Sequence, residues 1–208
     1  MNNLIVFGAG DLGKFIVYNI DMFDYKYNIL GFMDEDSNKI NQKLCGLPIF
    51  DIGYLQSNQI DNLCMIIAIN SPLAKEAIVK KLKPYNIEFP NFIAPGSWIS
   101  NGVKMGCGTI IYPNCSVDFE SEIENFVTIN AGCSIGHNVN IGQFSSLAPG
   151  VNLAGFTQIE KGASLGIGCC SIQNINIGCN AVIGGQAMLI EDVEPQKTVV
   201  GVPAKTIK

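Results

Sequence analysis

The sequence contains no arginine and a single histidine, and these shortages exclude several functions. A nucleic-acid-binding domain usually presents a basic patch, whereas this chain of 208 residues has 13 lysines, 18 acidic residues and a net charge of −5. His137 alone cannot supply the three histidines of a zinc site of the carbonic anhydrase type. We therefore expect neither a nucleic-acid partner nor a bound metal.

Long apolar runs and paired cysteines are missing as well. No apolar run approaches the roughly 18 residues of a membrane-spanning helix, and the apolar segment at residues 3–7 follows the first residues without a signal-peptide pattern. The eight cysteines form no CxxC pair. We interpret them as thiols in a reducing compartment rather than as a disulfide framework. The sequence thus predicts a cytoplasmic protein without membrane contact.

What the sequence does contain is a period of six residues between Ile93 and Leu189. Every sixth residue in this stretch is a large aliphatic or methionine, with one exception at Ser171. Four residues after most of these stands a small or β-branched side chain, and three of those are Cys115, Cys133 and Cys169. A period of six fits neither a helix nor an ordinary strand. It is typical of a solenoid whose repeated unit is a short strand and a corner.

This pattern resembles the hexapeptide-repeat left-handed β-helix. In that fold three hexads complete a triangular coil of 18 residues, and successive coils are stacked at about 4.8 Å, the spacing of hydrogen-bonded strands. The large aliphatic residue points into the prism and the small one fills the space beside it. Residues 91–208 are therefore predicted to form a left-handed parallel β-helix with a C-terminal cap.

The first 90 residues predict a small Rossmann-like α/β domain with a parallel sheet. Apolar segments at 3–7, 27–33 and 63–69 are expected strands, and helices are expected up to about Asp21 and from Pro72 to about Lys83. A G-x-G-x-x-G motif lies between the first strand and the first helix, where backbone amides can face a phosphate. The candidate substrate-binding residues are Gly8, Gly10, Asp11, Gly13 and Lys14 in this loop, and Asp34, Glu35 and Asp36 after the second strand.

Two other interpretations of this motif remain open. A dehydrogenase would carry it too, but a full dinucleotide domain has two mononucleotide halves, and the repeats begin too early for both. Alternatively, the glycines serve only to let the strand and the helix pack closely.

The segment from Val199 to Lys205 (VVGVPAK) resembles the tail of hexapeptide acyltransferases, which borders the coenzyme A pocket. Together, the α/β domain, the repeats and this tail resemble the bacterial sugar acyltransferases that include sialic acid O-acetyltransferases and nucleotide-4-aminosugar N-acetyltransferases. The resemblance implies that the first domain binds a nucleotide-linked sugar, that the prisms form a homotrimer, and that acetyl-CoA lies between neighbouring prisms. The cofactor-binding residues it implies are Ser146, Gly155, Gly166, Ile167, Gly185, Gly201, Pro203 and Lys205.

His137 is the candidate catalytic base. It lies two residues after Ile135, at neither interior position of the hexad, so we expect it near a corner with its side chain outward. The family carries its base in this segment, and the resemblance implies that Asn138 orients the ring and that Asn130 helps to hold the acceptor. We expect Gly155, one coil later, to leave open space beside the imidazole.

The chain departs from the family pattern at three positions. An acidic residue usually follows the catalytic histidine, where this chain has Asn138. A second histidine is usual where Ser146 stands, and another in the glycine-rich loop where Asp11 stands. Asparagine can orient an imidazole by a hydrogen bond, but it carries no charge that would stabilise the imidazolium.

The resemblance implies an acetyl-CoA-dependent sugar acetyltransferase without a metal. The expected acceptor is the 4-amino group of a nucleotide-linked 4-amino-4,6-dideoxysugar used in surface glycan biosynthesis. O-acetylation of sialic acid or a related sugar is an alternative. A non-catalytic sugar-nucleotide-binding protein is another, and Asn138 and Ser146 favour it.

Overall fold

The computed structural model describes residues 2–23 and 27–208, and the chain divides into two compact units. One unit comprises the described residues up to Asn70 together with Ala74–Pro90, and the other comprises Ser71–Leu73 and Asn91–Lys208. The first is an α/β unit and the second a parallel β-helix, so the expected fold class is confirmed. No helix in the described part of the chain is long and apolar enough to cross a membrane.

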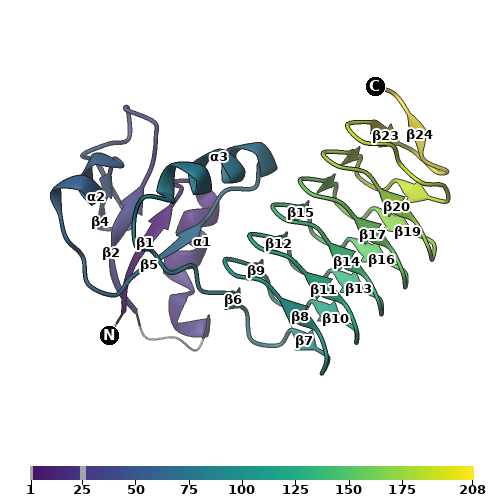
Figure 1. Cartoon of the computed structure of the whole chain (residues 1–208), viewed down its shortest axis with the longest axis horizontal. Helices are drawn as coiled ribbons and strands as arrows, with labels where there is room; N and C mark the ends of the chain where they lie inside the picture. The colour runs from purple at the N-terminus through teal and green to yellow at the C-terminus, as the bar shows by residue number, and fades with distance from the viewer. Residues whose placement is uncertain (1, 24–26) are drawn as a thin grey trace. The chain divides into compact units, whose positions relative to one another are not determined.

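The α/β unit contains a five-stranded sheet in the order β3-β4-β2-β1-β5 (Figure 1). The central strand β1 is parallel to both its neighbours, and residues 4–7 of this strand are buried. Only β3 runs antiparallel to its neighbour. The elements of this unit are β1 (Asn2–Phe7), α1 (Asp11–Tyr18), a 3-10 helix (Ile20–Phe23), β2 (Tyr27–Met33), β3 (Lys43–Leu44), β4 (Leu47–Phe50), α2 (Gly53–Ser57), β5 (Leu63–Ile67) and α3 (Pro72–Leu82).

The strands and helices expected in this unit are present, with slightly different ends. Sequence analysis missed β3, β4 and α2, because Pro48 interrupts the apolar run of β4 and α2 is only five residues long. Proline is tolerated within a strand where no hydrogen bond between strands needs its missing N–H.

Three parallel sheets form the faces of the β-helix, and its coils follow one another from teal to yellow in Figure 1. From β6 to β19, each strand pairs with the strand three further along the chain, as in the pairing of Ser116 with Ser134 and of Ser134 with Asn152. This three-sided arrangement is consistent with a left-handed parallel β-helix. The strands are β6 (Phe92–Ile93), β7 (Trp98–Ile99), β8 (Lys104–Met105), β9 (Ile110–Ile111), β10 (Ser116–Val117), β11 (Glu122–Ile123), β12 (Thr128–Ile129), β13 (Ser134–Ile135), β14 (Asn140–Ile141), β15 (Ser146–Leu147), β16 (Asn152–Leu153), β17 (Gln158–Ile159), β18 (Ser164–Leu165), β19 (Cys170–Ser171), β20 (Asn176–Ile177), β21 (Val182–Ile183), β22 (Met188–Leu189), β23 (Thr198–Val200) and β24 (Lys205–Thr206).

The corners of the β-helix depend on a left-handed backbone conformation. Every sixth residue from Gly96 to Gln186 has a positive φ. Glycine and asparagine occupy most of these positions, as expected from their tolerance of this region. Phe126 and Phe144 are exceptions, and their rings stack at 5.4 Å with an interplanar angle of 4°. At these two corners, ring stacking between successive coils thus accompanies a left-handed backbone conformation that is unfavourable for phenylalanine.

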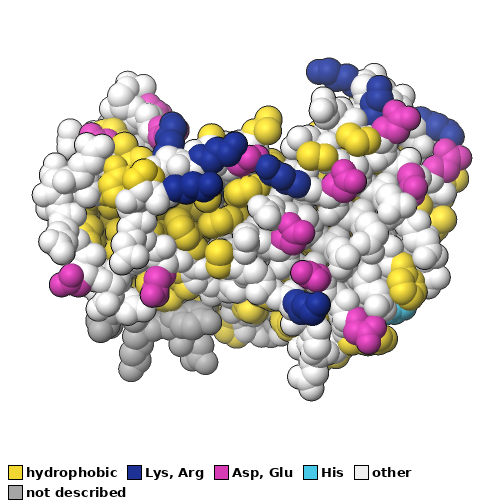
Figure 2. Space-filling model, viewed as in Figure 1, with side chains coloured by type: hydrophobic (Ala, Val, Ile, Leu, Met, Phe, Trp, Pro, Cys, Tyr) yellow, Lys and Arg dark blue, Asp and Glu magenta, His cyan; other side chains and the backbone are white. Residues whose placement is uncertain are grey.

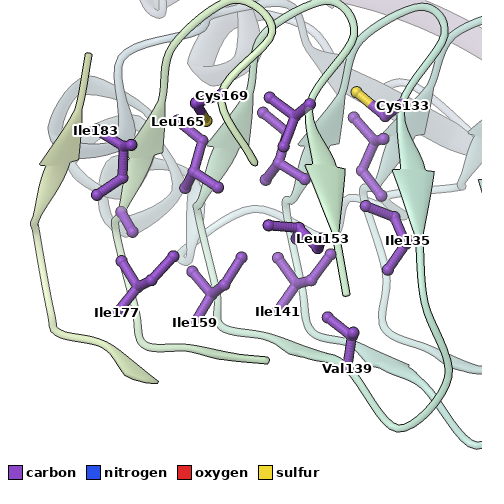
Figure 3. Close-up of a cluster of buried hydrophobic side chains, with 14 of the residues drawn as sticks. Cys133, Ile135, Val139, Ile141, Leu153, Ile159, Leu165, Cys169, Ile177 and Ile183 are labelled. Atoms are coloured by element: carbon purple, nitrogen blue, oxygen red, sulfur yellow. The ribbon is translucent and has the colours of Figure 1, made fainter. Parts of the chain in front are cut away.

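The aliphatic residues of the six-residue series fill the interior, as Figure 3 shows for residues between Cys133 and Ile183. The exception, Ser171, is also buried, and its hydroxyl lies 3.0 Å from that of Thr157. The interior cysteines are free thiols. Burial raises the pKa of Cys169 to about 12, so its thiol is protonated at neutral pH.

The last coil ends in a hairpin. Strand β23 pairs in parallel with β21 and antiparallel with β24. This hairpin extends the eight-stranded sheet and gives the edge of β21 a hydrogen-bonded neighbour. It provides the closing cap that the sequence indicated.

Replacing a single interior residue should test how much the prism depends on its packing. Ile177 is fully buried, and Ile177→Ala is expected to lower the free energy of unfolding by about 2–5 kcal/mol because it leaves a cavity. Ile177→Val should cost only about 0.5–1.5 kcal/mol. Denaturant unfolding followed by circular dichroism measures both variants, and equal stability of the alanine variant and the unmodified protein would contradict this account of the core.

Candidate active site

His137 lies between β13 and β14, at a corner between two faces of the β-helix, and its side chain is half-buried. Phe119, one coil earlier, stacks on the imidazole at 5.4 Å between ring centroids and 9° between planes. Phe156 meets the ring edge-on, at 5.0 Å and 90°. Two aromatic side chains therefore fix the orientation of the only imidazole in the chain.

Gly155 lies directly beside this ring. A Cβ atom at position 155 would be only 2.8 Å from both Cε1 and Nε2 of His137. The imidazole itself therefore occupies the space that the missing side chain provides. This differs from the expectation that Gly155 leaves open space beside the ring, because the ring lies against Gly155 on the next coil.

The imidazole is hydrogen-bonded to the residue that follows it. His137 Nδ1 lies 2.9 Å from Asn138 Oδ1, so the expected orienting partner is in place. The amide group of Asn138 in turn donates from Nδ2 to Oε2 of Glu120, at 2.8 Å. With Nδ1 held in this way, Nε2 is the nitrogen that can accept a proton.

Four of the other predicted residues lie at a different corner of the prism. Asn130, Gly166, Ile167 and Gly185 all follow strands of the eight-stranded sheet and precede strands of the six-stranded one. His137, by contrast, lies between the six-stranded and the five-stranded sheets. Within one chain, Gly155 is therefore the expected cofactor residue that lies beside the base, and these four residues are not brought to it.

The remaining residues expected to bind the cofactor lie along the same eight-stranded sheet. Ser146 is half-buried on β15, and Gly201 and Pro203 are exposed in the turn between β23 and β24. Lys205 is the first residue of β24 and is also exposed. Ile167, which is 61% exposed, is an aliphatic side chain at this corner that could cover part of a ligand.

The glycine-rich loop of the α/β unit separates structural from accessible positions. Gly8 has a φ of 117°, and a Cβ atom there would be 2.6 Å from the carbonyl oxygen of Ala68. A Cβ atom on Gly13 would be 2.1 Å from the carbonyl oxygen of Gly8. No heavy atom lies within 4 Å of a Cβ built on Gly10. Gly8 and Gly13 are therefore required for packing, whereas Gly10 faces open space where a ligand could approach.

Asp34 holds this loop in place rather than offering a free carboxylate. Its Oδ2 accepts hydrogen bonds from the backbone N–H of Ala9 at 2.8 Å and from Lys39 Nζ at 3.0 Å. Burial by itself raises the pKa of Asp34, but hydrogen bonds from the N–H of Asp36, from Lys39 and from Ala9 outweigh it, so the pKa is lowered. Asp34 is thus ionised at neutral pH and ties the end of β2 to the loop.

The other charged candidates in this unit are more accessible. Glu35 and Asp36 are exposed, and Glu35 is paired with Lys81 of α3. Asp11 and Lys14 pair with each other at 3.0 Å across the first turn of α1. These side chains surround the loop, while no group of three His, Cys, Asp or Glu residues in the described part of the chain is arranged to hold a metal ion.

Sequence reasoning missed three residues around His137, namely Phe119, Glu120 and Phe156. Their signal was the coil length of 18 residues, which separates Phe119 from His137, and Glu120 and Phe156 from Asn138. The same spacing places Gly155 one coil after His137 and Phe119 one coil before it.

Comparison with known proteins finds a family model that matches the first unit and solved structures that share the fold. Residues 3–82 match the family model described as the PglD N-terminal domain. The structure of PerB from Caulobacter crescentus, in complex with CoA and GDP-perosamine, has a TM-score of 0.91 at 20% identity. The match covers 100% of this chain and 98% of the PerB chain.

Two further solved structures extend over the whole chain. WeeI from Acinetobacter baumannii AYE has a TM-score of 0.91 at 24% identity, with 100% of both chains covered. The acetyltransferase domain of PglB from Neisseria gonorrhoeae FA1090, in complex with acetyl coenzyme A, has a TM-score of 0.89 at 24% identity, again with 100% of both chains covered. These likenesses show a shared fold over the full length of the chain.

The packing glycine Gly13 and the accessible glycine Gly10 should respond differently to an added methyl group. Gly13→Ala is expected to destabilise the α/β unit by about 1–3 kcal/mol, because its Cβ clashes with the backbone at Gly8. Gly10→Ala should change stability by less than about 1 kcal/mol, since its Cβ meets nothing. Thermal unfolding of the two variants side by side tests this, and equal losses would contradict the division between packing and ligand-facing positions.

Proposed function

We propose that this protein transfers the acetyl group of acetyl-CoA to the 4-amino group of a nucleotide-linked 4-amino-4,6-dideoxysugar, with His137 as the base. The observation that carries the proposal is the imidazole at a β-helix corner with Nδ1 held at 2.9 Å by Asn138 Oδ1. The fold that surrounds it is shared over its whole length with PerB, whose structure contains CoA and GDP-perosamine.

The reaction requires one proton to move twice. The neutral amine of the sugar attacks the thioester carbonyl carbon, and Nε2 of His137 takes the amine proton as the C–N bond forms. The C–S bond then breaks, and the imidazolium returns the proton to the departing thiolate, which leaves as free CoA. An amine is a better nucleophile than a hydroxyl, and this favours N-acetylation at a site whose histidine is followed by an amide rather than a carboxylate.

The α/β unit is proposed to bind the nucleotide of the sugar. Amides at the N-terminus of α1 suit a phosphate, and Gly10 leaves the backbone there open to close approach. Because Asp34 is engaged with Ala9 and Lys39, Glu35 and Asp36 are the better candidates for contacts to the ribose or the base. The proposed division is a nucleotide-sugar-binding domain at 1–90 and an acyltransferase domain at 91–208.

A homotrimer is part of the proposal. The base lies at one corner of the prism beside Gly155, whereas the other residues expected to hold acetyl-CoA lie at another corner or along the eight-stranded sheet. A single chain therefore cannot complete the site, whereas neighbouring prisms that place these two corners face to face can. A cytoplasmic location is also proposed, supported by interior cysteines that are free thiols.

Acetyl transfer to a panel of acceptors tests the function directly. We expect acetylation of nucleotide-linked 4-amino-4,6-dideoxysugars and none of the matching 4-hydroxy sugars or of sialic acid. The acetylated sugar should be measured by mass, because the exposed thiol of Cys107 would also react with a thiol reagent. Acetylation of hydroxy sugars alone would favour an O-acetyltransferase, and binding without transfer to any acceptor would favour a non-catalytic protein.

Removal of the base should affect chemistry rather than cofactor binding. His137→Ala is expected to lower kcat by roughly 10²–10⁴, the usual contribution of a general base. Calorimetry should show an affinity for acetyl-CoA close to that of the unmodified protein. Undiminished turnover of the alanine variant on the accepted sugar would overturn the assignment.

The shared site predicts a defined oligomer. Light scattering at micromolar concentration should give the mass of three chains, each of 22.4 kDa. A monomer that transfers acetyl groups at full rate would contradict the model in which two chains form each site.

A further inference from the structure

We propose that Glu120 is a positioning residue for His137, acting through Asn138. In this relay, defined as Glu120, Asn138 and His137, the carboxylate sets the direction of both hydrogen bonds and supplies the negative charge that asparagine lacks. The inference rests on the proposed function, because it gives His137 the role of base.

The direction of the relay follows from what a carboxylate can do. An ionised carboxylate accepts hydrogen bonds but cannot donate them. The group of Asn138 that lies 2.8 Å from the Glu120 carboxylate must therefore be its amide NH2, which donates the hydrogen bond. The other amide atom, Oδ1, then faces His137 Nδ1 at 2.9 Å and can only accept, so Nδ1 carries the proton. This leaves Nε2 unprotonated, as a base requires.

Without the carboxylate, this order is lost. An asparagine beside a neutral imidazole can present either its oxygen or its nitrogen to Nδ1. In the second arrangement, Nδ1 accepts the hydrogen bond and the proton moves to Nε2, which can then no longer remove a proton from the acceptor. Glu120 thus selects the reactive tautomer from a distance of two hydrogen bonds.

The relay also places a negative charge near the imidazolium that forms during the reaction. The amide of Asn138 is polarised by the Glu120 carboxylate, so its oxygen becomes a stronger acceptor for the Nδ1 proton. The charge lies on the coil before His137, instead of on the residue after it. The relay therefore extends over two coils.

The β-helix itself brings the members of the relay together. Glu120 and Asn138 are 18 residues apart, and both have left-handed backbones, with φ of 56° and 58°. Equivalent corners on successive coils direct their side chains alike, so the two meet side by side. Glutamate is an unusual residue for this conformation, and the neighbouring corners in the same row carry Gly102 and Phe156. The carboxylate is present only on the coil next to His137.

The tautomer can be measured without any substrate. Because His137 is the only histidine, the two imidazole signals of a protein labelled with 15N-histidine are unambiguous. At a pH where the imidazole is neutral, we expect the unmodified protein to show the Nδ1–H tautomer and Glu120→Gln to show a substantial Nε2–H population. Glu120→Gln keeps the shape and can still hydrogen-bond, but it no longer acts solely as an acceptor. An unchanged tautomer in this variant would overturn the proposal.

The kinetic test compares Glu120→Gln with Glu122→Gln. Glu122 lies on β11 two residues away, and its partner is Lys104 at 3.7 Å, not Asn138. Glu120→Gln is expected to lower kcat by roughly tenfold, the lower end of the effect of losing a partner that orients a histidine, with the KM for acetyl-CoA unchanged. Glu122→Gln should retain the kcat of the unmodified protein. Equal losses in both variants would overturn a specific role for Glu120.

A double exchange provides a rescue. Glu120→Gln combined with Asn138→Asp moves the carboxylate next to the imidazole and the amide to the outer position. Position 138 keeps its left-handed backbone, which aspartate tolerates as asparagine does. We expect the Nδ1–H tautomer and most of the kcat to return, and a double variant as slow as Glu120→Gln would contradict the relay.

Failure of this inference is distinguishable from failure of the proposed function. If the unmodified protein acetylates no sugar, the proposed function fails, and a tautomer shift in Glu120→Gln would still demonstrate the relay. If the unmodified protein is active and Glu120→Gln shows neither the tautomer change nor the loss of kcat, only the relay is wrong.

Discussion

The left-handed backbone at every sixth residue is the constraint on which this structure depends. It turns the chain at each corner so that three short strands complete a coil, and the next coil pairs with it in register. Residues 18 apart consequently become neighbours, inside the prism and on its surface. The aliphatic interior, the stacked phenylalanines and the surroundings of His137 all follow from this one repeat.

The surroundings of His137 show how such a repeat can create a site. Phe119, His137 and Gly155 form one row across three coils, and Glu120, Asn138 and Phe156 form the row beside it. The glycine accommodates the imidazole, the aromatic rings orient it, and the carboxylate is close enough to act through an amide. In the face shown in Figure 2, most of the lysine side chains lie in the upper half of the view, whereas acidic side chains are spread over the surface.

In the α/β unit, by contrast, a buried sheet supports the glycine-rich loop. Gly8 and Gly13 are required by close backbone packing, and Asp34 fastens the loop from the next strand. Packing therefore explains the glycines at two of the three positions. Gly10 has no such requirement, which leaves it for a ligand. An acidic cluster that looked uniform in the sequence contains one structural residue and two accessible ones.

The sequence alone determined the fold class, because a period of six is incompatible with the other regular structures and because parallel strands need buried apolar segments. It also indicated that His137 lies near a corner with its side chain outward, since this residue occupies neither interior position of the hexad, whereas the resemblance to the acyltransferases made it the candidate base. Short elements such as β3, β4 and α2 escaped it, because a few residues carry too little periodicity to be recognised. Only the tertiary structure decided that Glu120 meets Asn138, that the imidazole fills the space over Gly155, and that Asp34 is engaged by the loop. A spacing of 18 residues places two residues on neighbouring coils, but it does not specify the side-chain directions or the distances of a few ångströms on which these contacts depend.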